Sequence, residues 1–151
     1  MYIEIRKALK SDCNSIVRFQ EEMAWDTERC KLDHDTVLKG VEAVLNSDAL
    51  GVYYVAVVEN EVVGSLLTTY EWSDWRNGTV LWIQSVYVDP SYRKQGVYKA
   101  LYDHIKILVS EDESFKGIRL YVDESNTAAR EVYLRLGMNG EHYRVFEWMK
   151  E

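Results

Sequence analysis

Cysteine, proline and long apolar runs are all scarce in this chain of 151 residues. Its two cysteines, Cys13 and Cys30, are too few and too poorly spaced for a disulfide framework or a metal site. No apolar stretch resembles a signal peptide or reaches the length of a membrane-spanning helix. Because no repeat or Pro/Gly-rich linker divides the chain, we expect one cytoplasmic, reduced protein that folds as a single domain over residues 1–151.

Positive charge is also in short supply. The chain has 18 Lys and Arg residues against 25 Asp and Glu residues, which gives a formal net charge of −7. Nucleic acids and anionic membranes bind basic surfaces, so we expect neither as a partner. His34, His104 and His142 share no metal-ligand spacing, so we also expect no metal.

Strand-like and helix-like patterns alternate along the chain. Ser11-Asp12 offers N-cap chemistry for a first helix, and the apolar spacing predicts a second helix near 35–46. Residues 79–89 are apolar on both faces, which is typical of a strand in the middle of a sheet. Further helices are predicted at 97–108 and 126–136. Further strands are predicted at 2–6, 52–58, 62–70 and 117–123. A last strand is predicted after Gly140, through Tyr143, Val145, Phe146 and Trp148. The order β-α-α-β-β-β-α-β-α-β predicts an α/β sandwich.

The stretch 86–97 carries the most informative signal. A strand through Val86–Val88 leads into a basic loop with Arg93 and Lys94, and a helix begins at Gly96. The start of a helix offers unpaired N–H groups and a partial positive charge, which together suit a phosphate. The sequence therefore predicts a phosphorylated cofactor at this turn.

Two segments, in the right order and in the right secondary structure, carry a family resemblance. The pattern Arg or Gln, then x-x-Gly-x-Gly/Ala, falls on Arg93–Tyr98, and a later segment runs Asn126-x-x-Ala129-x-x-x-Tyr133-x-x-x-Gly137-Met138. Ile5-Arg6-Lys7-Ala8 and Val62-Val63-Gly64 add weaker matches. With them the chain resembles the GNAT superfamily of acetyl-CoA-dependent N-acetyltransferases over nearly its whole length. The resemblance implies a mixed, mostly antiparallel sheet of about six or seven strands with helices on both faces.

The resemblance also implies how acetyl-CoA, the co-substrate, would be held. Strand Val86–Val88 would pair its backbone with the pantetheine arm, while the strand through Tyr121 splays away. Residues 93–98 would wrap the pyrophosphate, and Asn126 would fix the cofactor or cap its helix, or do both. The implied cofactor residues are Val86, Tyr87, Val88, Arg93, Lys94, Gln95, Gly96, Val97, Tyr98 and Asn126.

Tyr98 departs from the family pattern, which has Gly or Ala at that position. Its side chain either points sideways from the first helical turn, changing little, or lines the pyrophosphate pocket. Backbone N–H groups bind phosphate whatever the side chain, which favours the sideways interpretation.

By resemblance Tyr133 is the general acid that protonates the leaving thiolate, and the alternative is a packing tyrosine. Many relatives carry a glutamate near the position of Gln84, and Gln84 cannot accept a proton. Glu71 is our tentative general base. The alternatives are Asp74, the acidic residues Glu21, Glu22 and Asp26 of the first helix, and a water chain to bulk solvent.

For the acceptor we predict contacts with Trp25, Asp26, Trp72 and Gln84. Trp72 and Trp75 could wall an acceptor pocket, through apolar or cation–π contact, or could bury in a dimer interface. The expected activity is transfer of an acetyl group to a primary amine of a small molecule or peptide, by direct attack on the thioester. The alternatives are a catalytically silent acyl-CoA sensor or scaffold and a protein N-terminal or lysine acetyltransferase. A homodimer is also expected.

Overall fold

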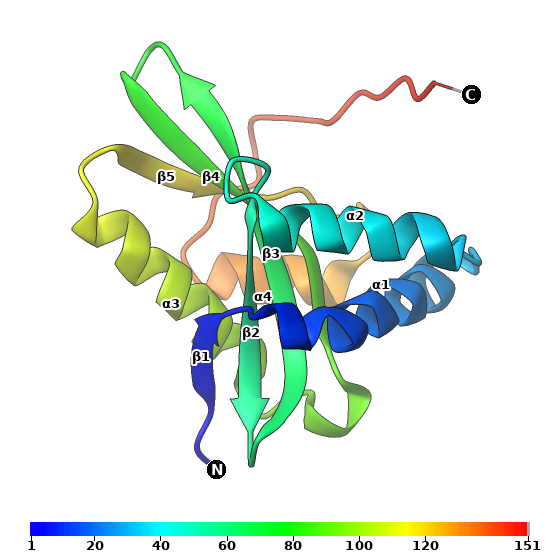
Figure 1. The fold of residues 1–151 in the computed structure, drawn as a ribbon. Helices are drawn as coiled ribbons and strands as arrows, with labels where there is room; N and C mark the ends of the chain where they lie inside the picture. The colour runs from blue at the N-terminus through cyan, green and yellow to red at the C-terminus, as the bar shows by residue number, and fades with distance from the viewer. Residues whose placement is uncertain (151) are drawn as a thin grey trace. The chain divides into compact units, whose positions relative to one another are not determined.

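The computed structural model describes residues 1–150, and the chain forms two compact units, Met1–Arg119 and Leu120–Glu151. The first unit holds one five-stranded sheet of order β1-β2-β3-β4-β5 (Figure 1). Its strands are β1 (Glu4–Lys7), β2 (Val52–Val58), β3 (Glu61–Ser73), β4 (Gly78–Val88) and β5 (Phe115–Arg119), and its α-helices are α1 (Cys13–Glu28), α2 (His34–Asn46) and α3 (Val97–Glu111).

The sheet is mixed and mostly antiparallel, as predicted. The β1–β2, β2–β3 and β3–β4 pairs are antiparallel, and β4–β5 is parallel. Strand β4 lies between β3 and β5, which is the central position that its two apolar faces predicted. Asn77, before β4, has φ of 50°, the left-handed backbone that a tight hairpin needs. The predicted number of strands is too high, since the described residues form five.

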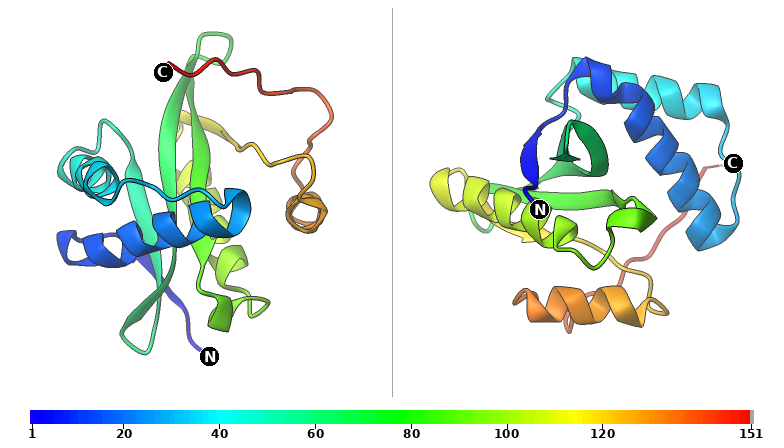
Figure 2. Two further views of the ribbon diagram at one scale, coloured as in Figure 1. Left: turned by 90° about the vertical axis from the view of Figure 1, so that its right-hand side faces the viewer. Right: turned by 90° about the horizontal axis from the view of Figure 1, so that it is seen from below.

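Helices cover both faces of the sheet in this unit. Ile16 of α1 and Val41 of α2 pack with Val55 of β2 in one buried cluster. On the other face, a Cβ placed on Gly64 of β3 would lie 3.3 Å from Val97 Cγ1 of α3. Figure 2 shows α1 and α2 on one side of the strands and α3 on the other. The sandwich layers predicted from the element order are therefore confirmed in this unit.

The start of α1 differs from the N-cap chemistry predicted for Asp12. The Asp12 carboxylate makes no cap bond to the helix, although Asp12 occupies the N-cap position. It accepts hydrogen bonds from the Leu9 N–H at 2.7 Å and from Arg6 Nη1 at 2.7 Å instead. Burial alone would raise the Asp12 pKa, but the bonds from Arg6 and Leu9 outweigh it and hold the pKa below its usual value. The residue ties β1 to α1.

The second unit contains helix α4 (Thr127–Arg135). Asn126 Oδ1 accepts from the Ala129 N–H at 3.1 Å, so the capping role weighed for Asn126 is present. Gly137 closes the helix with φ of 87°, as predicted.

The strand predicted after Gly140 is wrong. Residues 141–150 form neither helix nor strand. Phe146 and Trp148 are 93% and 87% exposed, although their pattern is that of a strand. A strand needs a neighbour to satisfy its backbone groups, and an apolar pattern does not supply one.

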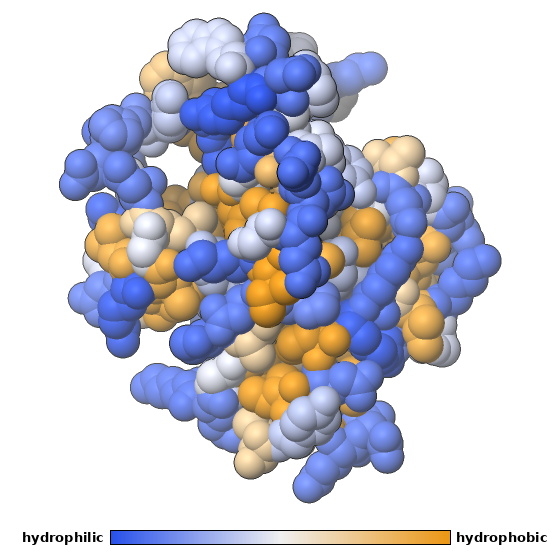
Figure 3. Space-filling model, turned by 90° about the vertical axis from the view of Figure 1, so that its left-hand side faces the viewer, coloured by the Kyte–Doolittle hydropathy of each residue, from blue (hydrophilic) through white to orange (hydrophobic). Residues whose placement is uncertain are grey.

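Figure 3 shows one face of the molecule, on which hydrophilic side chains separate smaller apolar patches. No helix among residues 1–150 is long and apolar enough to cross a membrane.

Candidate functional site

A bulge interrupts the central strand where the cofactor segment begins. Ser65 of β3 pairs with Tyr87 and Leu67 pairs with Gln84, so Ser85 and Val86 together face the single residue Leu66. Ser85 has φ of 55°, the left-handed conformation that accommodates the extra residue. A bulge leaves a residue outside the ladder and bends its strand. Ser85 and Val86 therefore lie outside the regular β3–β4 ladder, at the start of the segment predicted to pair with the pantetheine arm.

Strand β4 also extends beyond the last residue that pairs with β5. The parallel register runs from Thr79–Phe115 to Trp82–Arg119, where β5 ends. The second half of β4, up to Val88, has no further pairs with β5. An unpaired strand edge is a template for an extended partner, and a pantetheine arm has amides that suit it.

The basic loop opens helix α3 as the sequence predicted. Gly96 is the N-cap residue, with φ of 84° and no side-chain cap bond. The first backbone bond of the helix runs from the Ala100 N–H to the Gly96 carbonyl at 3.0 Å. The amides of Val97 and Lys99 precede this ladder and are available to an anion. A Cβ on Gly96 would meet no atom within 4 Å, so there is open space beside this turn.

The side chains of the loop differ in their contacts. Arg93 Nε donates to the Val88 carbonyl at 2.9 Å, and Gln95 Nε2 donates to the Ser91 carbonyl at 3.0 Å. These two residues shape the loop, whereas Lys94 is exposed and has φ of 62°. The Tyr98 ring stacks on Tyr102, one turn along α3, at 6.3 Å between centroids. This contact agrees with the sideways interpretation of Tyr98.

Tyr87 joins β4 to helix α1. Its hydroxyl donates to Glu22 Oε2 at 2.7 Å, and its ring stacks on Phe19 at 5.1 Å between centroids. Burial raises the pKa of Tyr87 to about 12, helped by its hydrogen bond to Glu22. The hydroxyl therefore stays protonated, and the pair holds Glu22, one of the alternative bases, beside β4.

Glu71, the tentative base, lies in a polar row across three strands. Trp82 Nε1 donates to Glu71 Oε1 at 2.9 Å, and Arg119 of β5 forms an ion pair with Glu71 Oε2. The Glu71 carboxylate is partly buried and is held in place by two donors. No local pattern predicts this Arg119 contact, because it depends on the β4–β5 register.

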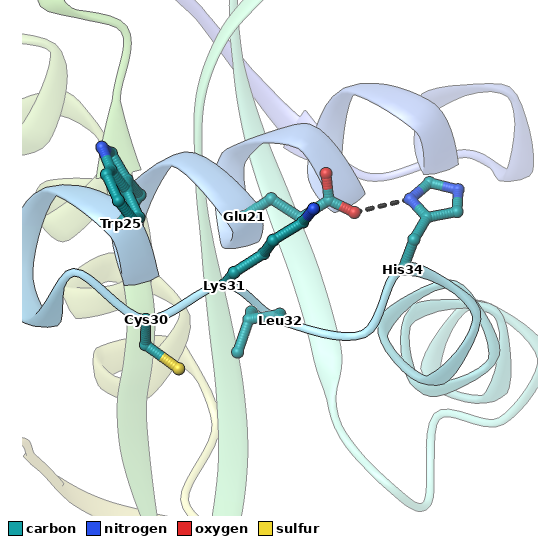
Figure 4. Close-up of a pocket in the computed structure, with 6 residues that line it drawn as sticks. All are labelled: Glu21, Trp25, Cys30, Lys31, Leu32 and His34. Atoms are coloured by element: carbon teal, nitrogen blue, oxygen red, sulfur yellow. Dashed lines mark hydrogen bonds and ion pairs between the residues drawn. The ribbon is translucent and has the colours of Figure 1, made fainter.

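Trp25 lines a pocket of about 290 Å³ beside the connection from α1 to α2. Figure 4 shows Glu21 and Trp25 on α1, His34 at the start of α2, and three residues of the connection that complete the wall. Those three are Cys30, Lys31 and Leu32. Asp26, Trp72 and Gln84, also predicted at the acceptor, do not line this pocket.

Sequence reasoning missed the contribution of His34 to this pocket. His34 Nδ1 lies 2.5 Å from Glu21 Oε1, and the Glu21 carboxylate raises the His34 pKa. The two residues are 13 positions apart, and only the α1–α2 turn brings them together. The Arg29 guanidinium carbon lies 5.5 Å from the centroid of the Trp25 ring. The ring that was predicted to contact the acceptor therefore has a partner within the chain.

The two other tryptophans weighed for the acceptor lie at the β3–β4 hairpin. Trp72 is 64% exposed and Trp75 is 91% exposed. Both rings are free of the core, so either of the two roles weighed for them is sterically open.

Tyr133 lies on α4, in the second unit. It is half-buried, as are Ala129, Val132 and Leu136 of the same helix. These four residues form the partly buried face of α4. Over residues 1–150, no group of three or more His, Cys, Asp or Glu side chains gathers as a metal site would.

Comparison with known proteins gives consistent matches. The sequence profile of the Acetyltransferase (GNAT) family matches residues 8–138. Thialysine N-epsilon-acetyltransferase from Bos taurus is 30% identical over 149 residues, which cover 90% of this chain and 84% of the bovine protein. A possible acetyltransferase from Clostridium difficile 630 superposes with a TM-score of 0.92 and 42% identity, over 100% of this chain and 99% of that chain. Aminoglycoside N-acetyltransferase AAC(6')-Iy, solved with CoA, gives a TM-score of 0.80 at 19% identity over 99% and 95% of the two chains, which shows a shared fold alone.

Proposed function

The chain belongs to the GNAT family of acetyltransferases, and from that premise we propose that it transfers the acetyl group of acetyl-CoA to a primary amine of a small molecule or peptide by direct attack on the thioester. The predicted class of enzyme, an N-acetyltransferase, is confirmed by the family match and by the bovine relative.

The observation that carries the proposal is the turn at Gly96. Its left-handed backbone, the open space where a Cβ would lie, and the available amides of Val97 and Lys99 fit a diphosphate. Lys94 and the terminal guanidinium nitrogens of Arg93 supply positive charge beside it. By the family resemblance, Asn126 would also bind the cofactor, in addition to accepting the bond from the Ala129 N–H.

When bound, acetyl-CoA supplies an acetyl thioester that an amine can attack. The backbone N–H near Val86, freed by the bulge, would polarise the carbonyl. The Tyr133 hydroxyl would donate a proton to the departing thiolate. A lysine-type amine has a pKa of about 10.4, so it must first lose a proton. We assign that step to Glu71, with Glu22 as the alternative.

The acceptor site is proposed at the pocket lined by Trp25. Glu21 places a carboxylate there, and the Trp25 ring an apolar face, both of which suit an amine with an aliphatic stem. Asp26, Trp72 and Gln84 remain acceptor candidates from outside this wall. By its name the bovine relative acetylates the ε-amine of thialysine, so lysine-like amines are the first acceptors to try.

The proposal is tested by mixing the protein with acetyl-CoA and a panel of amines and following release of free thiol. The panel should contain thialysine, lysine, diamines, an aminoglycoside and lysine-containing peptides. Turnover with at least one of the small amines is the expected result. Turnover with peptides alone would favour the protein acetyltransferase, and CoA binding without turnover on any amine would contradict the proposal.

A further inference from the structure

A column of side chains connects helix α1 to the phosphate loop. Phe19 of α1 is fully buried and stacks on Tyr87 of β4, with centroids 5.1 Å apart and planes inclined by 29°. The Arg93 guanidinium carbon lies over the Tyr87 ring, 5.3 Å from its centroid. The aromatic ring of β4 is therefore in contact with α1 and with the loop at once.

The Tyr87 ring is held firmly. Only 5% of the residue is exposed, and its hydroxyl donates to Glu22 Oε2 at 2.7 Å. Glu22 is itself steadied by Arg18, whose Nη1 lies 3.7 Å from Glu22 Oε1. Packing and this hydrogen bond together leave the ring one orientation.

Arg93 is fixed at two points and open at a third. Its Nε donates to the Val88 carbonyl at 2.9 Å, and its planar group lies over the Tyr87 ring. For the described residues, neither contact involves the two terminal nitrogens, which form the fork that binds phosphate oxygens in pairs. An exposed arginine would otherwise sample many rotamers, and ordering it would reduce affinity for an anion.

We propose that Tyr87 is a positioning residue for the cofactor: its ring, fixed from α1 by Phe19 and Glu22, orients the Arg93 guanidinium toward the pyrophosphate. This inference rests on the proposed function, since it assumes that the loop before α3 binds a diphosphate. It gives the Tyr87 side chain a role distinct from the backbone contact with pantetheine.

The test is a double-mutant cycle on the dissociation constant of CoA, measured by calorimetry on wild type, Tyr87→Leu, Arg93→Gln and the double variant. We expect Tyr87→Leu to weaken CoA binding about fivefold, because binding must then order an arginine side chain that the ring no longer holds, at a cost of about 1 kcal/mol. We expect it to have no further effect when Arg93 is already Gln. A purely structural role would weaken binding by the same factor in both backgrounds, and that result would overturn the inference, as would no weakening at all.

Three further variants keep the result interpretable. Tyr87→Phe retains the ring and should bind CoA more tightly than Tyr87→Leu. Tyr53→Leu removes another buried strand tyrosine, 6% exposed and on β2, and controls for lost packing. Arg93→Lys leaves the core intact and keeps the charge, but it loses the Val88 bond and the planar fork. It should bind CoA nearly as weakly as Arg93→Gln, and wild-type affinity would overturn the inference even if Tyr87→Leu does not fold.

Failure of the proposed function has a different signature. If the wild-type protein does not bind CoA at all, the diphosphate assignment is wrong, and the inference falls with its premise. If wild type binds CoA and the cycle is additive, only the role of Tyr87 is lost.

Discussion

At the scale of single residues, the two candidate general bases are carboxylates whose hydrogen-bond and ion-pair partners affect their ability to accept a proton. Glu71 is engaged by Trp82 and Arg119, whereas Glu22 is engaged by Tyr87 and Arg18. Both carboxylates are held in place, which a general base requires, and both already have partners. Kinetics on variants can separate them.

Replacing Tyr133 with phenylalanine should lower kcat about 100-fold, because the leaving thiolate loses its proton donor. Acetyl-CoA affinity should stay nearly unchanged, since the ring remains. Steady-state kinetics and calorimetry check the two halves of this prediction. Tyr53→Phe, which removes a hydroxyl from a buried tyrosine of β2, is the control, and unaltered turnover of Tyr133→Phe at saturating substrate would end the general-acid assignment.

Replacing Glu71 with glutamine should lower kcat/KM about 100-fold, because the amine loses the group that accepts its proton. The same change breaks the ion pair with Arg119, so Arg119→Gln is the matched control. An equal loss of kcat/KM in both variants would make Glu71 structural and shift the assignment to Glu22.

We expect position 96 to disfavour any side chain, because of its positive φ, and a bulky side chain most of all. Gly96→Ala places a side chain at φ of 84°, which we expect to cost about 1 kcal/mol of stability. Gly96→Trp has the same strain and adds a large ring in the space assigned to the diphosphate. Calorimetry should show CoA binding at least tenfold weaker for tryptophan than for alanine, about 1.4 kcal/mol. Equal affinities for the two variants would contradict the phosphate site.

At the scale of elements, the ends of helices and strands do most of the positioning. Helix α3 begins at a glycine, α4 begins at the capping residue Asn126, and β5 ends at Arg119, opposite Trp82 in the middle of β4. The bulge at Ser85 then re-aims the rest of β4. Gly96, Asn126 and Arg119 therefore each lie where a helix begins or a strand ends.

The start of α1 gives a prediction about pH. The folded-state pKa of Asp12 is below its usual value, so its carboxylate stabilises the fold above an unfolded pKa of about 3.9. That contribution is lost as the pH falls through the folded pKa. Asp12→Asn should lower the free energy of unfolding by about 2 kcal/mol at neutral pH. The free energy of unfolding of Asp12→Asn should also fall less than that of wild type as the pH is lowered.

Denaturant titrations at several pH values measure this effect. Asp48→Asn is the control, because its ion pair with Lys7 is exposed and should contribute less than about 1 kcal/mol. Equal effects of the two substitutions, or an unchanged acid profile for Asp12→Asn, would contradict the role of Asp12 at this junction.

At the scale of the whole molecule, the large apolar side chains near the C-terminus remain exposed, Phe146 and Trp148 among them. Exposed apolar side chains that gather in one region often form an interaction surface. We therefore predict a homodimer that buries these side chains. Sedimentation velocity should show a dimer for wild type and a monomer for the double variant Phe146→Ser, Trp148→Ser. A monomeric wild type at all concentrations would contradict the prediction.

Local sequence signals were enough for most elements and for the phosphate turn. Gly96 alone accounts for a left-handed N-cap, and Asn126 for a capped helix, because these conformations depend on a few neighbouring residues. Apolar residues on both faces predicted that β4 lies inside the sheet. The same rules failed after Gly140, because a strand pattern forms a strand only beside a partner.

What the sequence determined by itself is the order of the elements as far as α4 and the chemistry available at their ends. Tertiary structure decided which distant groups meet: Tyr87 with Glu22, 65 positions away, and Glu71 with Arg119, 48 positions away. Both contacts depend on strand register and on how α1 packs against the sheet. Register is a property of all the paired strands together, so no local pattern could have specified these partners.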